Sequence, residues 1–346
     1  MLLRRLLAVL VAVGLVLAAG LVRARLVSDA PDPPALDELR IVCVDELAAV
    51  CAKLRVAGAA PVTEAATATV ARFAQRDPAV DVWVTLEPWS TMAADARRRE
   101  RLPELASTPS AVLATSPVLL AARSDRLAAL EGACDGGQLT WRCIGDRAGA
   151  PWSQLDAPAG WGDVDVAFNR PADTAEGLLT LAQLGAAFLD GAPVTPQAVA
   201  APEFFAWFAD LGRSSSQVAG QTPLERMLLT GGADVEFTGV VEGAARPLLD
   251  DAPAWEERIE LRELSPTVAA QVRAVGYGAT GRVAMSTVAA QLLDPLAAAG
   301  WRAADGASSP SGAPTSSPPD GQAGVGTPSA AALEALRQTW IEVSRG

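Results

Sequence analysis

The sequence predicts an α/β fold with a mostly parallel sheet. Short apolar stretches alternate along the chain with amphipathic stretches of helical period, and residues 163–168 show the strand pattern most clearly. There Val164, Val166 and Phe168 fall on one side and the acidic residues on the other, as in a strand with one buried face. At 346 residues, half of them apolar, the chain can bury a sizeable core in one or two domains.

The other elements follow in the same alternation. Apolar stretches predict strands at residues 39–44, 79–89, 110–125, 233–240 and 259–264. Helical periodicity predicts helices at residues 46–54, 62–77, 201–212, 285–301 and 330–343. In the strand 233–240, Val235 and Phe237 alternate with Glu236 and Thr238, which predicts one buried and one polar face.

A polar loop leads from strand 163–168 into a further helix. Asp173 or Thr174 is suited to cap this helix, and Glu176 stands three residues after Asp173, as in a capping box. The unpaired N–H groups and the dipole of a helix N-terminus can hold a ligand. An ordinary strand-to-helix connection with a good cap has the same pattern.

The beginning of the chain has the pattern of an export signal. Arginines flank the apolar run 6–22, which is long for a signal-peptide core and long enough to span a bilayer. Residues 1–25 are therefore predicted to form a signal-anchor or transmembrane helix, followed by a Pro- and Asp-rich linker at 26–37. Cleavage after Gly20 or Ala24 is the alternative and would secrete the protein. Either way the folded part is extracytoplasmic.

Composition excludes several classes of function. The net charge is −12, there is no histidine, and Lys53 is the single lysine, so neither nucleic acid nor a basic membrane-binding face is expected. The lack of histidine also rules out histidine-based triads and metal sites. No cofactor and no metal are predicted.

The four cysteines are consistent with an oxidising compartment. Cys43 and Cys51 are eight residues apart, and Cys134 and Cys143 are nine apart, so neither pair has the spacing of a zinc or redox motif. Four cysteines allow three pairings, and the two local pairings are favoured.

The stretch 305–328 is rich in Ser, Pro and Gly and is predicted to be a disordered insertion.

The order of elements is similar to that of a known family. The stretches that carry the likeness are LRIVCVDEL, DVWVTLEPWS, ATSPVLLAARSDRL, DVDVAFNRPADTAEGLLTL, ADVEFTGVVEG and the closing AAAGWR and LRQTWIEV. Together they resemble the type 2 periplasmic-binding-protein family, the extracellular solute-binding proteins of bacterial ABC importers. The resemblance covers most of residues 38–346 and rests on the order of loose motifs.

The resemblance implies two α/β lobes joined by crossover strands, with the ligand in the cleft between them. Residues 38–124 and 260–346 would form lobe one, and residues 125–259 would form lobe two. In that arrangement the helix after Thr174 faces the cleft, as ligands in open α/β sheets lie off the carboxyl ends of strands. The implied ligand contacts are Asp45, Glu46, Glu87, Trp89, Ser90, Asn169, Arg170, Thr174 and Thr238.

The first turn departs from the pattern of the family's anion binders. Asp45 and Glu46 stand where Ser, Thr and backbone amides are usual, and they would repel an oxyanion. A small cationic, zwitterionic or sugar-like ligand fits better, with Trp89 as a stacking surface.

Three functions follow from these observations. The first is a membrane-anchored solute-binding protein with a small-molecule ligand and a membrane permease as partner. The second is a cell-surface interaction or sensor module of the same fold, without a transport role. The third, a carboxylate-based cell-wall hydrolase using two of Asp45, Glu87 and Glu236, is disfavoured because no motif selects the pair. The protein is therefore expected not to be an enzyme.

Overall fold

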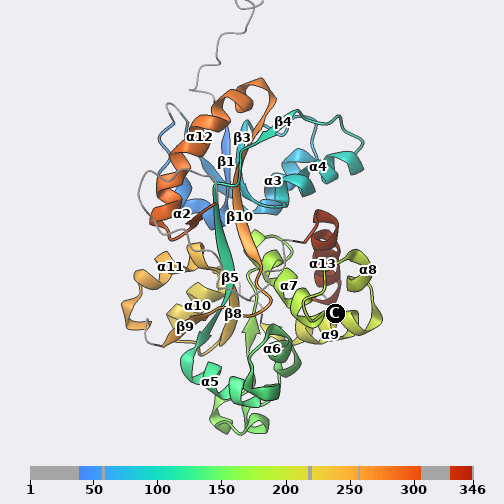
Figure 1. The fold of residues 1–346 in the computed structure, drawn as a ribbon, viewed down its shortest axis with the longest axis vertical. Helices are drawn as coiled ribbons and strands as arrows, with labels where there is room; N and C mark the ends of the chain where they lie inside the picture. Colours follow the sequence, from blue (N-terminus) through green and yellow to red (C-terminus); the bar gives the residue numbers. More distant parts are fainter. Residues whose placement is uncertain (1–38, 57–58, 217–219, 256–257, 305–327, 345–346) are drawn as a thin grey trace, which may run out of the picture.

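The computed structural model describes residues 39–56, 59–216, 220–255, 258–304 and 328–344, and Figure 1 shows its fold. The predicted membrane helix 1–25, the linker 26–37 and residues 305–327 of the predicted insertion lie outside these ranges. Within them, no helix is both long and apolar enough to cross a membrane.

The predicted α/β class is confirmed, since strands and helices alternate around one curled sheet. The prediction of a mostly parallel sheet is wrong: β1 pairs parallel with β2 and β3, and β6 with β7 and β8, but β5 and β10 pair antiparallel with all their neighbours. The strands of the described residues follow the order β2-β1-β3-β10-β5-β8-β6-β7, with β4, β9 and β11 pairing beside this path. Their bounds are β1 Ile41–Val44, β2 Val62–Glu64, β3 Val82–Leu86, β4 Ser107–Pro109, β5 Ala114–Arg123, β6 Val166–Ala167, β7 Ser215–Ser216, β8 Phe237–Val241, β9 Ile259–Arg262, β10 Ala269–Tyr277 and β11 Arg302–Ala303.

The strand β5 runs through both halves of the molecule (Figure 1). Its residues 114–117 pair antiparallel with β10, and its residues 118–122 pair antiparallel with β8. We call the body built on β1 to β4, β10 and residues 114–117 the first lobe. The body built on residues 118–123 with β6 to β9 is the second lobe.

Helices cover both faces of the sheet in each lobe. In the first lobe α2 and α12 pack on one face, and α3 and α4 on the other; in the second lobe α10 and α11 lie opposite α6, α7, α9 and α13 (Figure 1). The helix bounds are α2 Ala48–Cys51, α3 Ala66–Phe73, α4 Trp89–Arg99, α5 Ser124–Ala133, α6 Trp141–Arg147, α7 Ala175–Phe188, α8 Pro196–Val199, α9 Pro202–Ser214, α10 Pro223–Thr230, α11 Glu242–Asp250, α12 Gly278–Ala298 and α13 Ala330–Val343.

Because both faces are covered, several strands are buried along their whole length. Every residue of β1, β3 and β8 is buried, as expected for strands sandwiched between helices. The prediction of a polar face at 233–240 is therefore wrong: Glu236 is 3% exposed and Thr238 0%.

Most predicted elements differ from the observed ones at their ends, and three of the differences are informative. In the predicted helix 62–77, the β-branched start forms the strand β2 and only residues 66–73 are helical. The predicted strand 163–168 pairs over only two residues, although Val164, Val166 and Phe168 are all buried as its pattern indicated. The helix α12 begins at Gly278, before the apolar periodicity of 285–301 sets in.

The division of the chain into residues 38–124 with 260–346 and residues 125–259 stays a prediction. The last helix, α13, is assigned to lobe one by this prediction. In the structure α13 packs against α7, α8 and α9 of the second lobe and also touches α4 of the first.

The two predicted disulfides, Cys43–Cys51 and Cys134–Cys143, are both confirmed. Cys43 lies within the buried strand β1, and Cys51 is the last residue of α2. The disulfide Cys43–Cys51 therefore fixes the short helical turn between them to the sheet. Both of these cysteines are at most 1% exposed.

We expect the variant with Cys43→Ala and Cys51→Ala to lose about 2.5 kcal/mol of unfolding free energy, as the unfolded chain gains the freedom of the opened loop. Urea unfolding followed by circular dichroism measures this loss. Reducing agent should destabilise the parent more than the variant, because the parent loses both disulfides and the variant loses only Cys134–Cys143. Equal unfolding midpoints for the oxidised parent and the variant would contradict the prediction.

Candidate ligand-binding site

The first turn of α7 is closed by a hydroxyl cap. Thr174, the N-cap, accepts a hydrogen bond through Oγ1 from the Gly177 N–H at 3.1 Å, so of the two predicted caps it is Thr174 that is used. Gly177 is needed here because a Cβ would lie 2.2 Å from the Asn169 carbonyl oxygen. The loop 169–173 therefore folds back closely over the helix N-terminus.

The side chain of Glu176 points into the protein and does not complete a capping box, so that prediction is wrong. Its carboxylate accepts hydrogen bonds from Asn169 Nδ2 at 3.0 Å and from the Val241 N–H at 2.8 Å. The residue is 6% exposed. Burial disfavours the charged form and raises the pKa of Glu176 to about 7, and the negative charge of Glu46 adds to this shift.

A carboxylate from the first lobe occupies the N-terminus of α7. Glu46 lies in the 3-10 turn Asp45–Leu47 after β1, and its Oε1 accepts a hydrogen bond from the Glu176 N–H at 2.9 Å. The helix dipole favours a negative charge at this position. The other oxygen, Oε2, is buried and has no hydrogen-bond partner among the described residues, and burial raises the pKa of Glu46. The place of an anionic ligand is thus taken by the protein itself.

The two lobes also touch through backbone groups beside this carboxylate. The N–H and Oγ1 of Thr67, at the start of α3, donate to the Asp173 carbonyl oxygen at 3.3 and 3.4 Å. The loops from the two lobes are therefore in direct contact at the α7 N-terminus.

A cavity of about 290 Å³, which we call the inter-lobe cavity, lies beside Glu46. The turn after β1 and α2 line it from the first lobe, and the N-terminal parts of α7, α10 and α11 line it from the second. Its size is near the lower end of the range for small-molecule sites. Five of the predicted ligand contacts line it: Asp45, Glu46, Asn169, Arg170 and Thr174.

The charge of this cavity is predominantly negative. Its lining includes the carboxyl groups of Asp45, Glu46, Glu176 and Glu225, against the guanidinium of Arg170. Arg170 lies 4.0 Å from Asp45, and both side chains are about half exposed. Burial raises the pKa of Asp45, and Arg170 opposes that shift. A positively charged group is favoured in such surroundings and an oxyanion is repelled.

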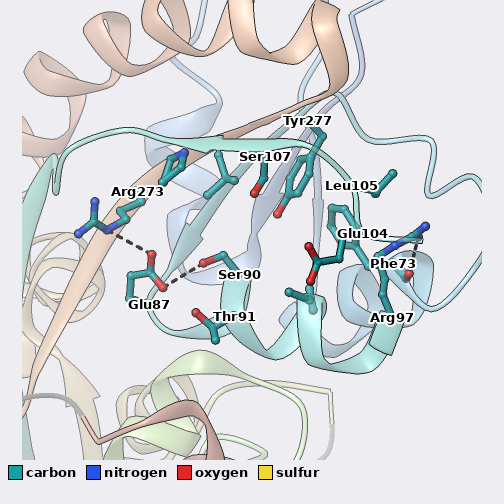
Figure 2. A pocket seen from close by; sticks show the side chains of 14 residues that line it. Phe73, Glu87, Ser90, Thr91, Arg97, Glu104, Leu105, Ser107, Arg273 and Tyr277 are labelled. Carbon is teal, nitrogen blue, oxygen red and sulfur yellow. Dashed lines mark hydrogen bonds and ion pairs between the residues drawn. The ribbon is translucent and has the colours of Figure 1, made fainter. Parts of the chain in front are cut away.

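The other four predicted contacts lie elsewhere. Glu87 and Ser90 line a separate cavity within the first lobe (Figure 2). Trp89 and Thr238 are at most 1% exposed and line neither of these two cavities. Because Trp89 packs in the core, it offers no ring face on which a ligand could stack in this structure.

Sequence reasoning missed part of the inter-lobe cavity. Thr222 and Glu225 line it at the start of α10, where they form a complete capping box. The stretch Thr-Pro-Leu-Glu at 222–225 is the signal that would have found this helix N-terminus. The spacing of Glu176 after Asp173 indicates only a capping residue. No local pattern reveals that its side chain points into the protein.

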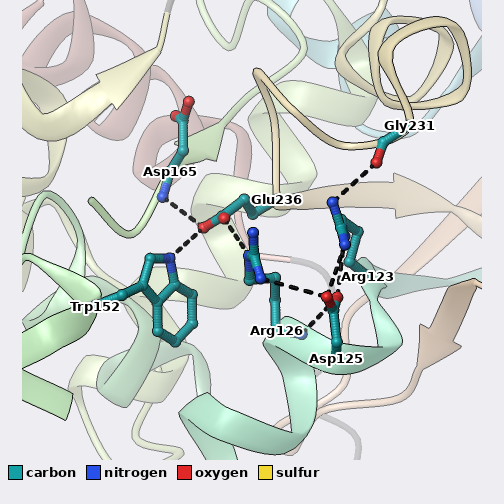
Figure 3. Close-up of polar contacts among 7 residues, drawn as sticks. All are labelled: Arg123, Asp125, Arg126, Trp152, Asp165, Gly231 and Glu236. Atoms are coloured by element: carbon teal, nitrogen blue, oxygen red, sulfur yellow. Dashed lines mark hydrogen bonds and ion pairs between the residues drawn. The ribbon is translucent and has the colours of Figure 1, made fainter. Parts of the chain in front are cut away.

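Glu236, one of the three carboxylates considered for hydrolysis, has a structural role (Figure 3). It accepts hydrogen bonds from Arg126 Nε, from Trp152 Nε1 at 2.8 Å and from the Asp165 N–H at 3.2 Å. Glu236 lines neither cavity, whereas Asp45 lines one and Glu87 the other. The three carboxylates are therefore not brought together as a catalytic pair requires. Across the described residues, no group of three or more His, Cys, Asp or Glu side chains could hold a metal ion.

Several solved structures have a fold similar to that of this chain. One similar structure, from Bordetella parapertussis, is described as an extracellular solute-binding protein; it has a TM-score of 0.53 and 13% identity and covers 90% of this chain and 99% of its own. The Trichodesmium protein IdiA (FutA), in complex with iron and citrate, has a TM-score of 0.51 and 8% identity, with coverage of 89% and 98%. The ferric binding protein from Campylobacter jejuni has a TM-score of 0.51 and 10% identity, with coverage of 88% and 97%.

At these identities the likeness shows the fold alone. No family model matches the sequence, and no curated protein matches it.

Proposed function

We propose that this protein is an extracytoplasmic solute-binding protein that encloses a small cationic or zwitterionic ligand between its lobes. The observation that carries the proposal is the inter-lobe cavity, to which both lobes contribute carboxyl groups. The strand β5, which pairs with β10 in the first lobe and with β8 in the second, would supply the hinge about which the lobes open and close. The two disulfides support an oxidising location outside the cytoplasm.

The ligand class follows from the polar groups of the cavity. The unpartnered Glu46 Oε2 needs a hydrogen-bond donor, and an ammonium group supplies both the donor and the opposite charge. The half-exposed Arg170 at the rim would pair with the carboxylate of a zwitterion. An amino compound therefore satisfies both ends of the site.

The remaining features of the proposal come from the sequence and from the resemblance. Residues 1–25 would anchor the protein in the membrane, with the folded part outside, or would be removed to release it. A membrane permease would be its partner in an import role.

The proposal is tested by thermal unfolding of the oxidised protein against amino acids, polyamines, sugars and oxyanions. A ligand at a hundred times its Kd should raise Tm by about 4 °C in a chain of this size. We expect amino compounds to give this shift. The variant Glu46→Gln should bind them at least about tenfold more weakly, since a charge-assisted hydrogen bond is lost.

The matched control is Glu203→Gln, which removes a carboxylate exposed on α9 and should leave the affinity unchanged. A shift produced by oxyanions alone, or an equal affinity in Glu46→Gln, would overturn the proposal.

One observation favours a second function, a cell-surface interaction or sensor module. Glu46 already fills the N-terminus of α7, and Thr67 of the first lobe donates hydrogen bonds to the Asp173 carbonyl oxygen of the second, so the protein's own groups hold the lobes together. A folded protein that responds to no compound of the panel would support this alternative.

A further inference from the structure

A second cavity, of about 500 Å³, lies wholly within the first lobe (Figure 2). We call it the first-lobe cavity. It is enclosed by the end of α3, by α4, by the segment 104–109 and by β10. It shares no lining residue with the inter-lobe cavity, so the two are separate sites.

A buried arginine holds the walls of this cavity together. Arg97, on α4, is 4% exposed, and its Nη1 donates to the carbonyl oxygens of Phe73 at 2.8 Å and Gln75 at 2.7 Å. Its Nε donates to the Pro103 carbonyl oxygen at 3.0 Å. The guanidinium thereby joins three segments of the chain. These carbonyl groups engage the Nε and Nη1 donors of the guanidinium.

One wall of the cavity is aromatic. The rings of Phe73 and Tyr277 pack with their centroids 4.5 Å apart, and the Tyr277 hydroxyl points into the cavity (Figure 2). Burial raises the pKa of the Tyr277 phenol, and the negative charge of Glu87 adds to the shift. The hydroxyl is therefore protonated at neutral pH and can donate a hydrogen bond as well as accept one.

The charged groups at the opposite end are paired with one another. Glu87 forms an ion pair with Arg273 at 3.2 Å and accepts a hydrogen bond from Ser90 at 3.0 Å (Figure 2). Two further hydroxyl groups, of Thr91 and Ser107, lie on the lining. The cavity therefore offers neutral hydroxyl groups, a compensated ion pair and the carboxylate of Glu104, which can accept hydrogen bonds from a ligand's hydroxyl groups.

We propose that the first-lobe cavity binds an uncharged polyhydroxylated ligand of the monosaccharide class. Such a ligand presents several hydroxyl groups that both donate and accept hydrogen bonds, as the hydroxyl groups and carboxylates of this lining require. Its hydroxyls would meet Tyr277 and Ser107 at one end and the Glu87–Arg273 pair at the other. The volume accommodates a hexose. This proposal is independent of the one for the inter-lobe cavity, and either can fail alone.

The sequence offers a direct probe, because Tyr277 is its single tyrosine. Incorporation of 3-fluorotyrosine into the full chain gives one ¹⁹F NMR resonance, located on the wall of the cavity. We expect titration with free hexoses and pentoses to shift this resonance saturably. The variant Ser107→Ala should bind the same sugar about three- to tenfold more weakly, as one hydrogen bond is lost.

A filling variant tests the location of the site. Ala94 lines the cavity and is exposed on α4, so Ala94→Trp should abolish the response without disturbing the core. Ala128→Trp, at an exposed position of α5, is the matched control and should retain it. Near-ultraviolet circular dichroism checks that each variant is folded. No saturable shift with any sugar, an undiminished response in Ala94→Trp, or a response to ammonium compounds alone would each overturn the proposal.

Discussion

Replacing Arg126 with alanine is expected to lower the free energy of unfolding by about 3–5 kcal/mol, because it leaves a buried carboxylate without its partner. The side chains of Arg126 and Glu236 are 8% and 4% exposed. The guanidinium carbon of Arg126 also lies 3.5 Å from the centroid of the Trp161 ring, so the substitution removes a cation–π contact as well. Urea unfolding measured by tryptophan fluorescence gives the loss.

The control for this prediction is Arg226→Ala, in the same lobe. Arg226 pairs with Asp234, but both side chains are about 45% exposed, so we expect a loss of less than about 1 kcal/mol. The double variant Arg126→Met with Glu236→Gln should recover much of the stability, because it removes both buried charges. Similar losses of unfolding free energy for Arg126→Ala and Arg226→Ala would show that the buried ion pair contributes no more to stability than the exposed one.

The second large effect is a dependence of stability on pH that arises from Glu176. Its pKa is about 7 in the folded protein against an ordinary value of 4.5, so the folded state binds more protons than the unfolded state between these values. Unfolding free energy should therefore fall as pH rises, by about 3 kcal/mol between about pH 5 and pH 8. Chemical unfolding at a series of pH values measures the slope.

The variant Glu176→Gln should be more stable than the parent at about pH 8 and should have a much flatter profile. Glu203→Gln, at an exposed position, should keep the parent profile. Burial raises the pKa of Glu46 in the same direction, so a residual slope is expected. Arginine partners lower the pKa of Asp81 and of Asp125. Protonation of these two carboxylates therefore destabilises the protein only at lower pH. A stability that rises from pH 5 to pH 8 would contradict the assignment.

Much of the fold could be predicted from the sequence because its determinants are local. Alternating strand and helix patterns indicate the α/β class, and the spacing of Cys43, Cys51, Cys134 and Cys143 favours the pairing that the structure has. The errors come from tertiary context. The stretch 233–240 alternates as a half-exposed strand does, yet helices on both faces of the sheet bury Glu236 and Thr238 together with the apolar residues.

The candidate site was only partly predictable, since its contacts join distant parts of the chain. Five residues at the ends of predicted strands and at the capped α7 line the inter-lobe cavity, and their contact with a ligand stays a prediction. No local pattern shows that Glu46 crosses to the α7 N-terminus, a contact that spans 130 positions of the sequence. The first-lobe cavity is similarly hidden, because it depends on the carbonyl groups that Arg97 brings together.

The shared strand β5 decides how this molecule can be divided. Within the one sheet, its residues 114–117 pair with the first-lobe strand β10, and its residues 118–122 pair with the second-lobe strand β8. A fragment that contains only one lobe would expose the backbone N–H and C=O groups of the other half of β5. Such an unpaired strand edge promotes aggregation by pairing with other chains. The two lobes therefore form a single cooperative unit, and the smallest autonomous piece that keeps either cavity is the whole two-lobe body.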